Sequence, residues 1–183
     1  SEPLAAVYGD RCVLRSFSPL RTIAGGRVIS PWGRKVKRFS PELEKLGRLA
    51  QGGEDDRLLV QLDLAGASGL EPRQMRAFTG LETRKLDRML QELGSRQAVV
   101  LFDRDEKRYV SGALMASLRT SLIDHLARYH RDNPLKAGIT RSEIASDWGR
   151  TLPAKLVHSL LERCQREGVV SADQEFLRLS GHK

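Results

Sequence analysis

Hydrophobic residues recur at helical spacing in two separate parts of the chain. Residues 55–67 and residues 113–130 each carry apolar side chains that lie three, four or seven positions apart. This spacing gathers the apolar side chains on one side of a helix, so both stretches predict amphipathic helices with one buried face. The positions that form the two faces are Leu58, Leu59, Leu62 and Ala65 in the first stretch and Leu114, Leu118, Leu122, Leu126 and Tyr129 in the second.

Two more helices and a β-ribbon are predicted after each amphipathic helix. The helices of the first set cover about 72–78 and 83–93, and those of the second set cover about 141–148 and 153–166. Short apolar runs separated by a polar turn then predict the ribbons. Their strands and turns are 98–102, 103–107 and 108–111 in the first set, and 168–172, 173–175 and 176–180 in the second. Three helices followed by a two-stranded ribbon is the order of a winged helix, a helix-turn-helix with a wing.

The two sets are related by an internal repeat. The segment GLEPRQM (69–75) resembles GITRSEI (138–144) at an offset of 69, and KLDRMLQEL (85–93) resembles KLVHSLLER (155–163) at an offset of 70. Two generic helical hairpins with accidental β-ends are the alternative, but matches in a common order at a near-constant offset favour two copies of one unit. The predicted fold class is mainly α with small β ribbons (α+β), as tandem winged-helix domains.

Local motifs predict where some of these helices begin. The segments TGLE (79–82) and TRSE (140–143) both fit the T-x-x-E capping box, in which the Thr hydroxyl and the Glu carboxylate accept free N–H groups of the first turn. Pro153 suits the first position of a helix, because its missing N–H would have no partner there.

A pair of short strands is predicted over residues 11–30, and these strands meet at Ser18-Pro19. No later segment supplies the strands that would complete their sheet, so we expect them to be left over from a β-barrel. The start of the chain has neither a secretory signal nor an initiator Met and is interpreted as a boundary within a longer protein. The predicted division is terminal barrel strands (1–31), a basic linker with a short helix (32–52), winged-helix domain 1 (53–112) and winged-helix domain 2 (113–183).

The net charge of +8 favours polyanionic partners, and this charge is concentrated in one segment. Residues 11–48 hold ten Arg or Lys and two Glu, whereas the rest of the chain holds 21 basic and 21 acidic residues. Within the segment, RKVKR (34–38) lies between Trp32 and Phe39. Its basic side chains form either a solvated linker or an RNA contact, and the RNA-contact candidates are Arg34, Lys35, Lys37 and Arg38.

The third helix and the wing are the usual contact elements of a winged helix. In the first unit these elements carry basic side chains interleaved with acidic ones, so they are either solvated surfaces or contacts to RNA or DNA; phosphate binding needs surplus positive charge on one face. The candidates are Arg84, Lys85 and Arg88 on the helix and Arg104, Lys107 and Arg108 on the wing.

No catalytic, cofactor-binding or metal-binding residues are predicted. The chain has no phosphate-binding G-x₄-G-K-[ST] loop, no nucleophile elbow, and histidines whose spacing does not suit a metal. Cys12 and Cys164 are far apart and fit no C-x-x-C pattern, which is typical of a reduced, cytoplasmic setting, and Cys164 is expected in the core. No apolar run is long enough to span a bilayer. We therefore expect no enzyme in these residues.

The strand pair resembles a known sequence pattern. RCVLRSFSPLRTIAGGRVIS (11–30) is similar to the closing strands of the third domain of elongation factor Tu-like translational GTPases, although Cys12 stands where Phe is usual. The features that carry the resemblance are Arg11, Val13, Leu14, Arg15, Arg21, Thr22, Ile23, Gly25, Gly26 and Val28. A tandem winged-helix array directly after that barrel resembles the bacterial selenocysteine-specific elongation factors, SelB. The similarity continues through KRFSPE, YHRDNPLKAGITRSEI and LSGH.

The resemblance implies a fragment of a factor that carries selenocysteinyl-tRNA to a ribosome paused at UGA. In that family the winged-helix array recognises a messenger-RNA hairpin, mainly through its last unit, and the full-length protein binds GTP and Mg²⁺. The leading hypothesis is that these two units are a spacer arm between the GTPase/tRNA-binding body and distal hairpin-binding domains, with auxiliary RNA backbone contacts. The alternatives are a tandem winged-helix DNA-binding transcription regulator and a protein-docking module. The oligomeric state is left open, because unclosed strands can also pair with a second copy.

Overall fold

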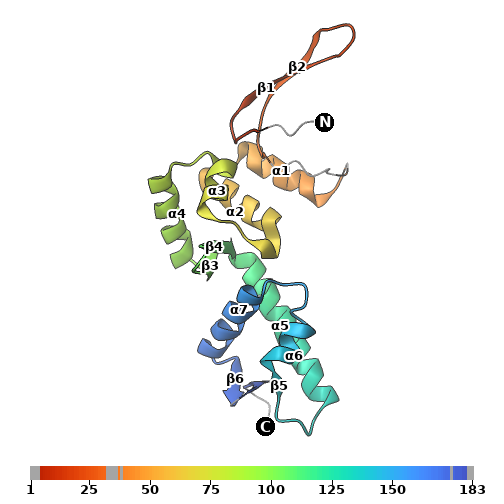
Figure 1. Ribbon diagram of the computed structural model, residues 1–183, viewed down its shortest axis with the longest axis vertical. Helices are drawn as coiled ribbons and strands as arrows, with labels where there is room; N and C mark the ends of the chain where they lie inside the picture. Colours follow the sequence, from red (N-terminus) through yellow and green to blue (C-terminus); the bar gives the residue numbers. More distant parts are fainter. Residues whose placement is uncertain (1–4, 32–36, 38, 174, 181–183) are drawn as a thin grey trace.

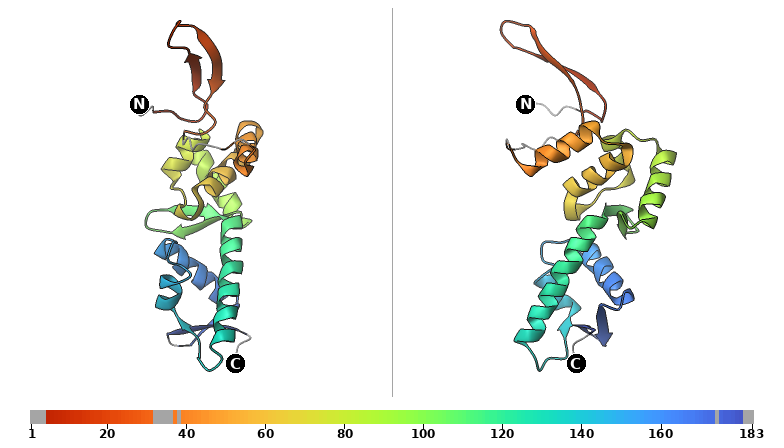
Figure 2. Two further views of the ribbon diagram at one scale, coloured as in Figure 1. Left: turned by 90° about the vertical axis from the view of Figure 1, so that its right-hand side faces the viewer. Right: turned by 180° about the vertical axis from the view of Figure 1, so that it is seen from behind.

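The hairpin and the two helical units that the sequence predicts follow one another along the long axis of the molecule (Figures 1 and 2). The structure is a computed structural model that describes residues 5–31, 37, 39–173 and 175–180. A β-hairpin lies at one end, the first helical unit in the middle and the second unit at the other end (Figures 1 and 2). No helix within these ranges is long and apolar enough to cross a membrane.

The N-terminal hairpin consists of antiparallel strands β1 (Arg11–Arg15) and β2 (Thr22–Arg27), which confirms the predicted strand pair. All residues of both strands are exposed. Val13 and Leu14 are neighbours and therefore point to opposite faces, yet they are 61% and 59% exposed. Apolar side chains on both faces of this hairpin thus lack cover.

The base of the hairpin is fixed to the first unit. The backbone N–H of Tyr8 donates to the carbonyl of Ala77 at 3.1 Å, and the Arg57 guanidinium lies 4.7 Å from the centre of the Tyr8 ring. A cation over an aromatic face is attracted by the ring quadrupole. Below the hairpin, helix α1 (Pro41–Gln51) packs on the next helix through Leu49, which is fully buried.

The first unit has the predicted order of three helices and a wing. Its elements are α2 (Glu54–Ala65), the short 3₁₀ helix η1 (Gly66–Ser68), α3 (Pro72–Thr79), α4 (Thr83–Ser95), β3 (Val99–Asp103) and β4 (Arg108–Ser111). Leu58 and Leu62 of the predicted apolar stripe are fully buried and pack with Met75 and Leu86 of the next two helices. The amphipathic pattern therefore placed the core correctly.

The second unit repeats this order. Its elements are α5 (Gly112–Asp132), β5 (Ile139–Thr140), α6 (Arg141–Ser146), α7 (Ala154–Arg166), β6 (Val170–Asp173) and β7 (Phe176–Leu179). β5 was not predicted, because a two-residue strand is too short to show a period. It pairs with β7 in a three-stranded sheet ordered β5-β7-β6. Its counterpart in the first unit is a single bridge between Leu70 and Tyr109.

One of the two predicted capping boxes is wrong. Thr140 and Glu143 form the predicted box at the start of α6, with backbone N–H donations at 2.8 and 3.2 Å. Thr79, however, ends α3, and its hydroxyl donates to the carbonyl of Met75. The capping box of the first unit is instead Glu71 with Gln74, which lies 69 residues before the pair in the second unit.

The wing of the first unit contributes residues to the cores of both units, although Leu101 of β3 is 40% exposed. Val99 belongs to the core of the first unit, whereas Val100, Phe102 and Val110 belong to the core of the second. Successive residues of a strand point to opposite faces, so the ribbon lies as a layer between the two units (Figure 1). The apolar run AVVLF, without alternation, is typical of a strand buried on both sides.

No linker separates the wing from the second unit. β4 ends at Ser111, and the Ser111 hydroxyl caps α5 by accepting the backbone N–H of Leu114 at 3.2 Å. Gly112 is required at this junction, because a Cβ there would overlap the carbonyl oxygen of Gln97. The predicted boundary between residues 112 and 113 thus falls within the first turn of α5, while the hydrophobic core continues across it.

Candidate nucleic-acid interface

The third helix of the first unit, α4, exposes the three basic residues predicted for it. Lys85 is ion-paired with Glu54 of α2 at 2.6 Å, so its charge is already compensated within the unit. Arg84 and Arg88 are exposed and four residues apart, which places them on one side of the helix. Neither arginine forms an ion pair with any residue that the structure describes. They are the available cations of this helix.

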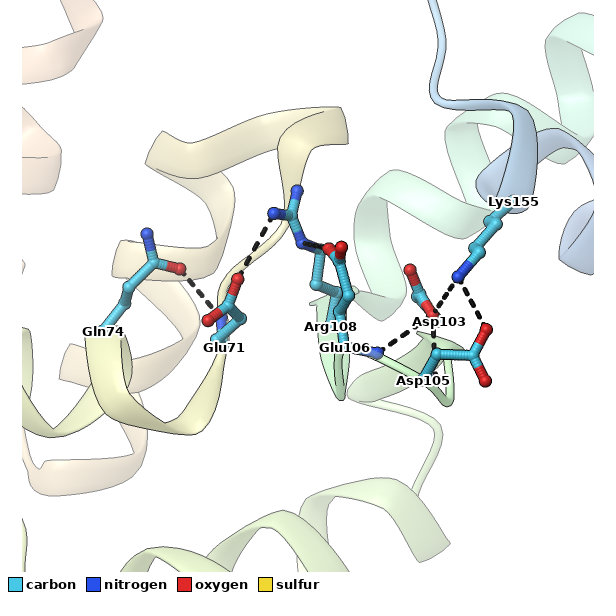
Figure 3. A network of polar contacts seen from close by, with 7 residues as sticks. All are labelled: Glu71, Gln74, Asp103, Asp105, Glu106, Arg108 and Lys155. Atoms are coloured by element: carbon cyan, nitrogen blue, oxygen red, sulfur yellow. Dashed lines mark hydrogen bonds and ion pairs between the residues drawn. The ribbon is translucent and has the colours of Figure 1, made fainter.

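The turn of the wing is held by an ion pair that joins the two units (Figure 3). The Nζ of Lys155, on the first turn of α7, lies 2.9 Å from Asp103 and 2.8 Å from Asp105. Asp103 is 5% exposed and also accepts the backbone N–H groups of Asp105 and Glu106 at 3.0 and 3.3 Å. Two acidic side chains of the predicted wing turn therefore bind the neighbouring domain.

The titration of both partners follows from this contact. The Lys155 ammonium, which donates to Asp103, lowers the pKa of that carboxyl below its ordinary value, and the two backbone N–H groups lower it further. The two carboxylates in turn raise the pKa of Lys155, Asp105 most and then Asp103. Each partner thus favours the charged form of the other, and the ion pair persists through the neutral range.

The basic residues of the wing divide into two kinds. Arg108 is partly buried, with its Nη2 3.3 Å from Glu71 of the α3 cap and its Nε 2.8 Å from Glu106 (Figure 3). It holds the wing against α3 inside the first unit. Arg104 and Lys107 are exposed at the turn and form no ion pair with the described residues. Only these two wing cations are accessible to an external anion.

The basic linker is described in part. Lys37 is exposed, whereas Arg34, Lys35 and Arg38 lie outside the described residues. The predicted RNA contact of this segment therefore stays a prediction.

The sequence analysis missed a further basic group in the turn between α3 and α4. Arg73 and Arg76 of α3 and Arg84 of α4 line an open hollow of about 670 Å³, together with Leu81, Glu82 and Thr83. All three arginines are exposed. Arg73 and Arg76 are three residues apart on a helix, a spacing that puts them on one face. That spacing is visible in the sequence, but α3 is not one of the usual contact elements of a winged helix.

The cysteines differ in their surroundings. Cys164 is fully buried in the core of the second unit, as predicted, and burial raises the pKa of its thiol. Cys12 is exposed on the hairpin. Among the residues that the structure describes, no three His, Cys, Asp or Glu side chains come together as a metal site would require.

Comparison with known proteins relates the whole chain to one group of translation factors. Residues 123–179 match the family model "Elongation factor SelB, winged helix". The selenocysteine-specific elongation factor of Desulfomicrobium baculatum is 46% identical over 180 residues, and that of Escherichia coli strain K12 is 29% identical over 187 residues. These alignments cover 98% and 99% of this chain and 28% of each relative, so the chain spans little more than a quarter of their length.

A solved structure supports the architecture. The crystal structure of a bacterial selenocysteine-specific elongation factor superposes with a TM-score of 0.58 at 16% identity, covering 95% of this chain and 26% of the other. At this identity the match concerns the fold. The two sequence relatives favour an elongation-factor fragment over a DNA-binding regulator or a docking module.

Proposed function

Because the chain belongs to the SelB family of selenocysteine-specific elongation factors, we propose that it forms the arm between the body and the distal domains of such a factor. The body would carry selenocysteinyl-tRNA to a ribosome paused at UGA, in the cytoplasm. The distal domains would read the messenger-RNA hairpin. GTP and Mg²⁺ would bind in the body and not in these residues. The support is family membership combined with an elongated, continuously packed structure.

The observation that carries the proposal is the wing shared by the two units. A wing that contacts nucleic acid projects into solvent, whereas β3 and β4 are packed between two cores. The ion pair of Lys155 with Asp103 adds a polar contact across the same boundary. In an arm of this kind the orientation of one unit fixes the orientation of the other, because the shared wing prevents them from turning independently.

The hairpin supplies the connection to the body. Its apolar side chains are exposed on both faces, including Phe17 (100%), Ile23 (65%) and Leu20 (74%). Soluble proteins rarely leave such a cluster uncovered. We propose that the remaining strands of an elongation-factor β-barrel cover it. The anchored Tyr8 at the hairpin base would then set the direction in which the arm leaves the barrel.

The rigidity of the arm can be measured with two spin labels and pulsed dipolar spectroscopy. With the exposed Cys12 replaced by Ser, labels on cysteines introduced at the exposed positions Gln91 of α4 and Arg128 of α5 report the distance between the units. A single narrow distance distribution is expected. A matched pair at Gln91 and Arg104, within the first unit, gives the width that the labels alone produce. A distribution between the units much broader than this reference would refute the rigid arm.

Ligand binding tests the assignment of partners. Fluorescence anisotropy against a selenoprotein messenger-RNA hairpin, a tRNA and a DNA duplex, each at two salt concentrations, is expected to show weak, salt-sensitive RNA binding with little preference for sequence. Tight and selective hairpin binding by this chain would contradict a spacer role, because it would place recognition in these two units.

A further inference from the structure

Three arginines of the first unit face one hollow without an internal anionic partner. Arg73, Arg76 and Arg84 line the hollow at the α3–α4 turn, and none of them forms an ion pair within the described part of the chain. Lys85 and Lys155, by contrast, are each paired with a carboxylate. Three unpaired cations of the first unit therefore lie together beside this turn, whereas Arg104 and Lys107 lie at the tip of the wing.

We propose that this hollow binds the phosphate backbone of a structured RNA. The choice of RNA rests on the proposed function, while the choice of phosphate rests on the side chains. The planar guanidinium group matches the oxygens of a phosphate with two parallel N–H donations and stays charged at every physiological pH. Three such groups against the single carboxylate of Glu82 leave a local surplus of two positive charges.

The lining indicates contact with the backbone and not with bases. The residues that border the hollow are three arginines, one glutamate, one threonine and Leu81, with no aromatic ring on which a base could stack. Leu81 is 6% exposed and contributes to the core beneath. We therefore expect affinity that depends on charge and on RNA shape, with little dependence on sequence.

The orientation of one arginine is already set. The Nη1 of Arg76 donates to the Thr83 hydroxyl at 2.8 Å, which ties the guanidinium to the start of α4. A side chain held in place loses less conformational entropy on binding than a free one. Arg88 lies one helical turn beyond Arg84 on α4 and continues the positive charge along the helix. An RNA phosphate backbone bound in the hollow would therefore extend along α4 toward Arg88.

The test uses the whole 183-residue chain and fluorescein-labelled RNA and DNA duplexes of identical sequence. The triple variant Arg73→Gln, Arg76→Gln, Arg84→Gln is compared with a control that removes the same charge from exposed positions of the second unit. That control is Arg128→Gln, Arg150→Gln, Arg166→Gln. Circular dichroism confirms that both variants fold.

The expected result is a loss of RNA affinity of about tenfold or more in the triple variant and about twofold or less in the control. The slope of log K against log salt is expected to fall by about 2, because each phosphate contact contributes about 0.7 to 0.9. Glu82→Gln is expected to tighten binding by about twofold to threefold. A gain of affinity cannot arise from unfolding. This variant therefore distinguishes an effect of local charge on RNA binding from an effect of a lost fold.

Several outcomes would refute the proposed phosphate-binding site at the α3–α4 turn. Equal losses in the triple variant and its control would show that only net charge matters. A wild-type chain without measurable RNA affinity would also overturn it, but would leave the arm intact, because the spin-label distances test the arm independently. Tighter binding of DNA than of RNA would count against both the RNA site and the proposed function.

Discussion

Phe102 provides the sharpest test that the wing belongs to both units. Its side chain is 8% exposed and belongs to the core of the second unit, although β3 follows α4 of the first. On the first unit it lies against Gly69, where a Cβ would stand 2.7 Å from the ring atom Cε1. Phe102→Ala therefore removes a ring that both units contact.

The expected loss of stability in this variant follows from the burial of the Phe102 side chain. Truncating a buried Phe to Ala costs about 3 to 5 kcal/mol, through lost transfer energy and the cavity that is left. In a chain of this size, each kcal/mol lowers the midpoint of thermal unfolding by about 2 to 4 °C, so the expected decrease is about 6 to 20 °C. Leu101→Ala is the matched control. Leu101 is the next residue on the same strand and is 40% exposed, so its truncation should cost about 1 kcal/mol.

The assay must report each unit separately. Trp148 is half-buried against the core of the second unit, and its indole N–H donates to the Ser121 hydroxyl at 3.0 Å. With Trp32 replaced by Phe in every variant, the fluorescence of Trp148 follows the second unit alone. Hydrogen exchange of the α4 amides follows the first. Both probes should shift in Phe102→Ala; an unchanged Trp148 transition would refute the shared wing.

Three further variants test the contacts described above. Lys155→Met should raise the pKa of Asp103 toward its ordinary 3.8, measured by NMR titration of the carboxyl carbon. The contribution of Asp103 to the free energy of unfolding is fully present above pH 3.8 and is lost as the pH falls through the lowered pKa of its carboxyl group. The contribution of Lys155 to the free energy of unfolding is fully present below pH 10.5 and is lost as the pH rises through the raised pKa of its ammonium group. The stability difference between wild type and variant should therefore be constant from about pH 5 to 9 and shrink in acid; a difference that grows in acid would contradict the ion pair. Gly69→Ala should lower the free energy of unfolding in urea by about 2 kcal/mol or more, because Gly69 has φ +65° and a crowded Cβ position, whereas Gly94→Ala, in open space on α4, should be neutral or stabilising. Thr140→Ala should lower the thermal midpoint through the loss of about 1 kcal/mol of capping energy, and an unchanged midpoint would show that the cap contributes nothing.

The sequence predicted what depends on local periodicity. The leucines of α2 and α5 recur at helical spacing, and four of the predicted positions are fully buried: Leu58, Leu62, Leu122 and Leu126. Val60 and Met115 are buried as well, although the predicted faces did not include them. The capping box at Thr79 failed because a four-residue motif does not show whether its threonine begins a helix or, as here, bonds back to the carbonyl of Met75 at its end. The repeat offset of 69 would have corrected it, since this offset relates Thr140 to Glu71.

The parts that failed depend on contacts distant in sequence. Asp103 and Lys155 are 52 residues apart, and nothing in either segment shows that they meet. The apolar run AVVLF was predicted only as a ribbon strand, and the second surface that covers it lies in another domain. The pair Arg73 and Arg76 was visible as a spacing, whereas its convergence with Arg84 depends on the angle of the α3–α4 turn.

The direct passage from β4 into α5 limits how such chains can vary in length. One residue added at the junction would rotate the following helix by about 100° and move it along its axis by about 1.5 Å. That rotation would turn Leu122 and Leu126 away from their core and carry the whole second unit to a new orientation. Changes in length among homologues should therefore spare residues 110–114 and gather in exposed turns such as 133–137. The orientation of the second unit relative to the first is therefore set at a single junction.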